Sequence, residues 1–71
     1  MAQNTPEPTL HLQWRRRGAW ATSFSRRASL EVLETQMRLI DSYRGGNWPQ
    51  RIIDDDGRIL LQNEAARQLG A

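Results

Sequence analysis

Residues 26–44, RRASLEVLETQMRLIDSYR, decide the fold of this chain. Apolar side chains recur in this stretch at intervals of three or four residues, which is the spacing of one face of an α-helix. They are Leu30, Leu33, Met37 and Ile40. Ser25 stands where a helix N-cap is expected, and Gly45 and Gly46 follow Arg44 as a helix stop. The sequence therefore predicts a helix over residues 26–44.

The predicted helix carries a second apolar stripe, about 120° further round. This stripe consists of Val32, Leu39 and Tyr43. We expect the first stripe to pack in the core, because the segments on both sides of the helix need an apolar partner. The second stripe is the better candidate for contact with a partner protein.

The segment before the helix, residues 9–24, predicts a β-hairpin. Its two halves alternate along the chain with period 2, which is typical of half-buried strands. The positions on one face are Leu10, Leu12 and Trp14 in the first half, and Trp20, Thr22 and Phe24 in the second. The residues between the halves are Arg15-Arg16-Arg17-Gly18, and Gly18 suits the positive φ of a tight turn. This pairing predicts that Trp14 and Trp20 lie close together on the apolar face.

The segment after the helix, residues 51–62, predicts a second hairpin with its turn at Asp54-Asp55-Asp56-Gly57. Asn63 is the expected N-cap of a short helix over residues 64–69. We therefore predict one small α+β domain over residues 9–71, with the order ββαββ. Its long helix packs on an antiparallel sheet, and a short helix follows at the C-terminus. Residues 1–8, MAQNTPEP, are polar and contain two prolines, so we expect a disordered tail.

The last stretch, residues 51–71, resembles the opening of a PAS sensory domain. That family begins with a strand, an Asp-x-x-Gly turn, a second strand, an Asn and a short helix rich in Ala and Leu. The matching parts here are Ile52-Ile53, Asp54 to Gly57, Arg58 to Leu61, Asn63, and Glu64 to Leu69. A PAS domain continues beyond this point, so the resemblance implies either a truncated sensor fragment without a ligand pocket or a common hairpin followed by a helix. The whole chain is more loosely similar to small stand-alone bacterial ββαββ proteins, which implies no activity.

Positive charge is concentrated in the first part of the chain. The net charge is +2, all ten basic residues are arginine, and residues 1–28 carry five of these against Glu7 alone. A cluster of arginines can contact phosphates, and a nearby tryptophan can stack on a base. The candidate binding residues are Arg15, Arg16, Arg17, Trp20, Arg26 and Arg27. The other explanation of the same charges is a solvated turn or contact with an acidic protein.

The composition excludes several classes of site. The 71 residues include no cysteine and one histidine, which rules out disulfides, thiolate metal sites and histidine-rich metal sites. Asp54–Asp56 do not fit an EF-hand, because the twelfth position counted from Asp54 is Ala65 instead of Glu. His11 falls on the polar face of the first strand, where we expect it to be solvated. The chain contains neither a G-x-S-x-G elbow nor a G-x-x-x-x-G-K-[ST] phosphate loop.

These observations favour a small cytoplasmic protein that is not an enzyme and needs no cofactor or metal. Its second apolar stripe predicts a regulatory or protein-interaction module with a protein partner or a homodimer, formed through the helix or through an open strand edge. The first alternative is a small nucleic-acid-binding protein that uses the basic hairpin. The second alternative is a truncated PAS-type sensor. No membrane contact and no small-molecule substrate are expected.

Overall fold

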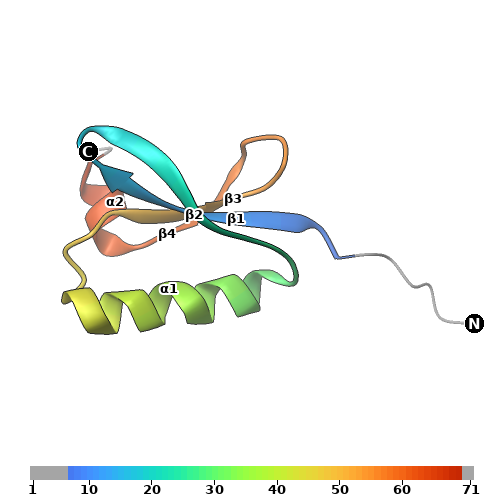
Figure 1. Ribbon diagram of the computed structural model, residues 1–71, viewed down its shortest axis with the longest axis horizontal. Coiled ribbons are helices and arrows are strands. Elements are labelled where there is room, and N and C mark those ends of the chain that lie inside the picture. The colour runs from blue at the N-terminus through green and yellow to red at the C-terminus, as the bar shows by residue number, and fades with distance from the viewer. Residues whose placement is uncertain (1–6, 70–71) are drawn as a thin grey trace, which may run out of the picture.

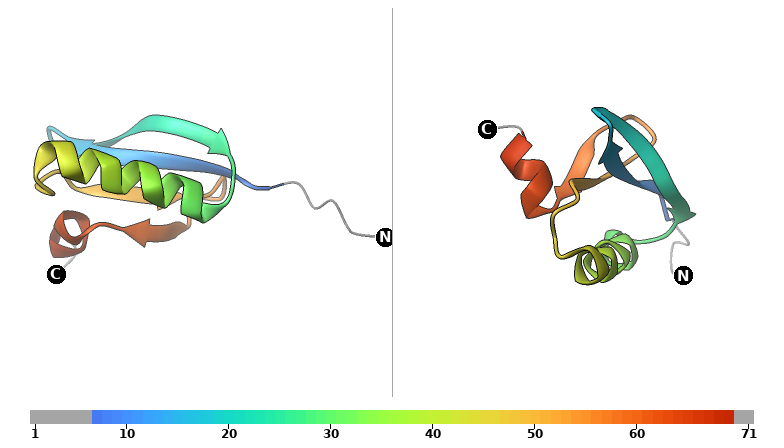
Figure 2. Two further views of the ribbon diagram at one scale, coloured as in Figure 1. Left: turned by 90° about the horizontal axis from the view of Figure 1, so that it is seen from below. Right: turned by 60° about the vertical axis from the view of Figure 1, so that its left-hand side comes forward.

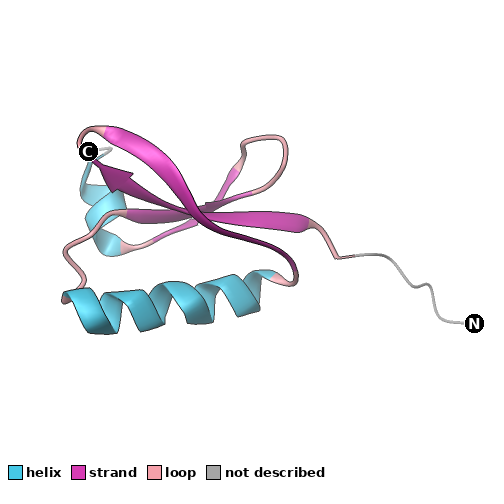
Figure 3. Cartoon of the chain, viewed as in Figure 1, coloured by secondary structure: helices cyan, strands magenta, loops and turns pink. Residues whose placement is uncertain are grey.

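The computed structural model describes residues 7–69, which form one sheet and two helices (Figure 1). Strands β1 (Thr9–Arg16) and β2 (Ala19–Arg27) precede helix α1 (Leu30–Arg44). Strands β3 (Gln50–Ile53) and β4 (Ile59–Gln62) lead to helix α2 (Glu64–Leu69). The strands lie in the order β2-β1-β3-β4, and every neighbouring pair is antiparallel (Figure 3). The predicted α+β class, with an antiparallel sheet, a long helix and a short helix, is confirmed.

Helix α1 lies against one face of the sheet, and the core fills the space between them (Figure 2). The buried apolar side chains of this core are Leu10, Leu12, Ala28, Leu33, Met37 and Ile52. Leu30 and Ile40 of α1 are partly buried against them, so the predicted core stripe of the helix is confirmed. Because side chains alternate along a strand, His11, Gln13 and Arg15 point to the opposite face of the sheet. We call this opposite side the open face.

Helix α1 begins four residues later than the sequence predicts. The predicted N-cap, Ser25, lies inside β2, and Ser29 takes the cap position instead. Strand β2 continues through Arg26 and Arg27 because these residues pair with Leu10 and Thr9 of β1. The predicted helix end is confirmed, since Gly45 adopts φ 69° and the Gly46 N–H donates to the Asp41 carbonyl oxygen at 2.9 Å.

A β-bulge changes which side chains of β2 face the core. Leu12 pairs with Phe24, but the next residue of β1, Gln13, pairs with Thr22, which leaves Ser23 as an extra residue. The Ser23 hydroxyl donates to the Leu12 carbonyl oxygen at 3.1 Å. The bulge reverses the alternation, so Phe24 faces the core whereas Trp20 and Thr22 lie on the open face. The prediction that Trp14 and Trp20 share one face is therefore wrong.

The second hairpin and the final helix form where the sequence predicts them. Asp54 Oδ1 accepts hydrogen bonds from the N–H groups of Asp56 and Arg58, both at 2.9 Å, which fixes the turn. Asn63 Oδ1 accepts from the Ala66 N–H at 2.9 Å and caps α2 as predicted. Most of the predicted tail, residues 1–8, lies outside the described residues. Within residues 7–69, neither helix is long and apolar enough to cross a membrane.

Candidate functional site: an arginine–tryptophan end

The sequence analysis predicts one binding site for two groups of arginines, but the structure places the two groups far apart. Arg15, Arg16 and Arg17 lie at the turn between β1 and β2, whereas Arg26 and Arg27 end β2 at the other side of the sheet. Eight residue steps along a strand span roughly 26 Å, so one small ligand cannot contact both groups. Only the first group lies near further arginines and tryptophans.

The tip of the first hairpin is a two-residue turn in which an arginine, Arg17, stands where Asn or Gly is usual. Arg17 and Gly18 both adopt positive φ, of 52° and 80°. Two-residue hairpin turns with this backbone favour Asn-Gly or Gly-Gly, because a left-handed conformation costs a residue with a Cβ roughly 1–2 kcal/mol. Arg17 bears this cost while its side chain is exposed to solvent. The tip therefore displays a guanidinium group at some expense to stability.

Two tryptophans near the hairpin tip, on the α1 side of the sheet, pack against each other, and an arginine lies over each ring. The rings of Trp14 and Trp48 lie 4.9 Å apart at an angle of 53°. The guanidinium of Arg16 lies 5.4 Å from the centroid of Trp14, and that of Arg44 lies 4.5 Å from the centroid of Trp48. These distances are within the range of cation–π attraction. Two guanidinium groups are thus positioned by aromatic rings.

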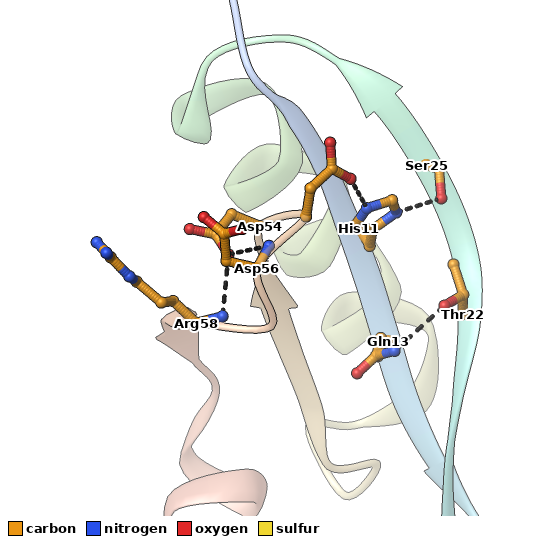
Figure 4. A network of polar contacts seen from close by, with 8 residues as sticks. His11, Gln13, Thr22, Ser25, Asp54, Asp56 and Arg58 are labelled. Atoms are coloured by element: carbon orange, nitrogen blue, oxygen red, sulfur yellow. Dashed lines mark hydrogen bonds and ion pairs between the residues drawn. The ribbon is translucent and has the colours of Figure 1, made fainter.

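The third tryptophan, Trp20, holds two arginines on the open face. Arg15 pairs with Trp20 across the strands, and its guanidinium lies 5.8 Å from the ring centroid. The guanidinium of Arg51 lies closer, at 4.2 Å, and its Nε donates to Gln13 Oε1 at 2.8 Å. Gln13 Nε2 in turn donates to Thr22 Oγ1 at 3.2 Å (Figure 4). This row of contacts fixes Arg51 in the middle of the sheet.

We call this part of the molecule the arginine–tryptophan end. It comprises Arg15, Arg16, Arg17, Arg44, Arg51, Trp14, Trp20 and Trp48. Within residues 7–69, the ion pairs join His11 to Asp55, Arg38 to Glu34 and Arg67 to Glu64, so none of the five arginines of this end has an acidic partner. Burial lowers the pKa of the Arg51 guanidinium, and the positive charge of Arg15 lowers it further. This end is therefore a concentration of uncompensated positive charge.

Sequence reasoning missed Arg44 and Arg51, which belong to the end as fully as Arg15 does. Arg44 is the last residue of α1, and only the return of the chain through Trp48 brings an aromatic ring beneath it. Arg51 reaches Trp20 because β3 pairs with β1 and Gln13 lies opposite Arg51. Gln50 and Ile52 of β3 are buried, and this alternation indicates that Arg51 points to the opposite face of the sheet. The residues that lie beside Arg51 follow only from the order of the strands.

His11 is more constrained than the sequence predicts. It does lie on the open face, yet its side chain is only 23% exposed. Its Nδ1 lies 2.8 Å from Ser25 Oγ, and its Nε2 lies 2.7 Å from Asp55 Oδ1 (Figure 4). The prediction of a solvated histidine is therefore wrong, because His11 connects β2 to the turn between β3 and β4. Residues 7–69 contain no group of three metal-ligating side chains, and Asp54 serves the turn.

The second apolar stripe of α1 lies at the surface. The exposed fractions are 38% for Val32, 49% for Leu39 and 79% for Tyr43. Tyr43 lines a hollow next to the arginine–tryptophan end, together with Trp14, Ile40 and Arg44. The stripe is therefore accessible from solvent, and its contact with a partner protein stays a prediction.

Comparison with protein-family models, curated proteins and solved structures found no match to this chain. The resemblance of residues 51–71 to a PAS opening, and the looser one to stand-alone ββαββ proteins, therefore stay predictions. The candidate site is therefore argued from geometry alone. Five arginines at one end of the sheet have no acidic partner within residues 7–69, and four of these arginines lie on tryptophan rings.

Proposed function

We propose that this chain is a small non-enzymatic module that binds single-stranded nucleic acid through its arginine–tryptophan end. The observation that carries the proposal is the placement of four guanidinium groups on three tryptophan rings with no acidic partner in residues 7–69. Aromatic rings restrict the guanidinium groups without using their N–H donors. Those donors stay available for phosphate oxygens.

The aromatic content of this end favours a single strand over a duplex. Unstacked bases can stack on tryptophan rings or on the planes of arginine guanidinium groups, whereas the bases of a duplex are already stacked. Asn47, Trp48 and Pro49 form a hollow of about 410 Å³ with the three arginines of the hairpin tip. A hollow of this size, lined by an aromatic ring and positive charges, suits a base with its phosphate. Little sequence preference is expected, because stacking and phosphate contacts do not read base edges.

Binding to labelled single strands, measured by fluorescence anisotropy, tests this proposal. If about four arginines contact phosphates, raising the salt from about 50 to about 200 mM is expected to weaken binding about fifty-fold. Duplex DNA of the same sequence is expected to bind more weakly. Failure to bind single-stranded DNA and RNA at the lower salt would contradict the proposal.

Two double variants test whether binding depends on the arginine–tryptophan end or only on the net charge of the protein. Arg16→Ala with Arg17→Gly removes two charges from the hairpin tip, and we expect affinity at low salt to fall about tenfold and the salt slope to drop by about 1.4. Glycine is preferred at the positive φ of Arg17, so the fold should not suffer. Arg26→Ala with Arg27→Ala removes the same charge at the far end of β2 and is the control. Equal losses in both variants would indicate binding by net charge alone.

The exposed stripe of α1 favours a second candidate function, as a protein-interaction module. A self-associating helix would bury Leu39 and Tyr43 in a symmetric contact. This function predicts a concentration-dependent dimer in sedimentation equilibrium that Leu39→Glu abolishes. Arg38→Gln is the control, because it changes the charge by the same amount at an exposed position of the same helix away from the stripe. A protein that stays monomeric at all concentrations would require a different protein as the partner of this stripe.

A further inference from the structure

A pocket of about 220 Å³ lies on the open face beside α2. It is lined by Arg15, Trp20, Arg51, Gln62, Ala66 and Leu69. The strand pairing brings these side chains together, since Arg15 lies opposite Trp20 and Arg51 lies opposite Gln62. Ala66 and Leu69 of α2 form the apolar part of the wall. Two guanidinium groups therefore share one small hollow.

The two guanidinium groups of this pocket lie close together, and neither has an acidic partner in the part of the chain that the structure describes. Both contact the ring of Trp20. Arg51 Nε is committed to Gln13, and the two terminal nitrogens of Arg51 have no hydrogen-bond partner within residues 7–69. Burial lowers the pKa of Arg51, and the positive charge of Arg15 lowers it further, which reflects repulsion between the two guanidinium groups. An anion between them would replace this repulsion with charge-assisted hydrogen bonds.

We propose that this pocket binds a phosphate monoester at the end of a nucleic-acid strand. A monoester carries a charge of about −1.5 to −2 near neutral pH and three strong acceptor oxygens, which matches two guanidinium groups. An internal phosphodiester carries a single charge and leaves one arginine uncompensated. The identity of the strand rests on the proposed function, whereas recognition of the monoester is a property of the pocket itself.

The test compares three labelled strands of one sequence, about 12 nucleotides long, carrying a 5′-phosphate, a 3′-phosphate or hydroxyls at both ends. Anisotropy titrations of the wild-type protein are expected to show one phosphorylated strand binding about tenfold more tightly than the hydroxyl-ended strand. Arg51→Gln and Arg15→Gln are expected to abolish this preference. Arg51→Lys keeps the charge but loses the planar, forked donors, so it should lose most of the preference for the phosphorylated strand.

Arg58→Gln is the matched control, because it removes one charge from the exposed turn between β3 and β4. This variant should retain the full preference for the phosphorylated strand. Equal affinity of the wild-type protein for all three strands would overturn the pocket assignment and leave the proposed function intact.

If no strand binds, the proposed function fails, and inorganic phosphate alone then tests the pocket. A saturable NMR shift of the Arg51 Nε–Hε signal, absent in Arg15→Gln, would support an anion site there. No shift at millimolar phosphate would overturn it. Inorganic phosphate that binds as tightly as the phosphorylated strand would also contradict recognition of a strand end.

Discussion

Asn63→Ala is expected to lower the free energy of unfolding by about 3 kcal/mol, which is a large fraction of the stability of a domain of this size. Asn63 is 7% exposed and uses both atoms of its amide. Its Oδ1 accepts from the N–H groups of Gln50 and Ala66, both at 2.9 Å. Its Nδ2 donates to the Trp48 carbonyl oxygen at 2.7 Å and to Asp41 Oδ1 at 3.0 Å. One side chain therefore ties α2, β3, α1 and the connecting loop together.

The expected loss combines two physical costs. Removing an N-cap costs about 1 kcal/mol, and leaving the buried N–H of Gln50 without a partner costs about 1–3 kcal/mol more. Urea denaturation followed by far-ultraviolet circular dichroism measures the change. Asn47→Ala is the control, since Asn47 is exposed in the same loop and should change stability by less than about 0.5 kcal/mol. Similar stabilities for the two variants would show that the Asn63 amide is not a structural hub.

Inserting one alanine between Leu12 and Gln13 is expected to have an equally large effect on stability and to dismantle the Trp20 contacts. The inserted residue gives Ser23 a partner, so regular pairing continues past Leu12 and Phe24, and a shift of one residue transfers a strand's side chains to the other face. Either Phe24 leaves the core or Trp20 leaves the open face, where it contacts Arg15 and Arg51. The first outcome costs about 3 kcal/mol, as for other losses of a large aromatic from a core.

NMR contacts between the Trp20 ring and the Arg51 side chain distinguish these outcomes. We expect the insertion either to lose these contacts or to keep them with a lower midpoint of unfolding. Ser23→Ala is the control, because it removes the hydroxyl that donates to Leu12 but retains the bulge. An insertion variant with native stability and native Trp20 contacts would mean that the bulge is not what sets the two faces of β2.

Much of the fold could be predicted because its strongest signals are local. The spacing of Leu30, Leu33 and Met37 identifies the buried face of α1, and Gly45 marks its end. The start of α1 was misplaced because two serines, Ser25 and Ser29, both suit a cap, and the pairing of Arg26 and Arg27 with β1 decides between them. That pairing is a contact between segments distant in sequence, which periodicity does not contain.

The candidate site was predicted only in part, for the same reason. Arg15 and Trp20 were predicted from their place near a turn, but their shared face depends on the two-residue turn that pairs them directly. Arg51 joins them only through the neighbouring position of β3 and β1. Arg26 and Arg27 were nominated by composition, and the length of β2 removes them from the site. The local sequence is therefore enough to predict the basic hairpin tip. The other residues of the site are brought to the tip by pairing between strands that are distant in sequence.

The gathering of all three tryptophans of the chain at one end has a practical consequence. Indole emission from this protein originates wholly within the surface to which binding is assigned. Each indole also has a guanidinium against it, so displacement of an arginine by a ligand changes the surroundings of a chromophore directly. The unlabelled protein is thus its own optical sensor, and a ligand that leaves its emission spectrum unaltered must bind elsewhere.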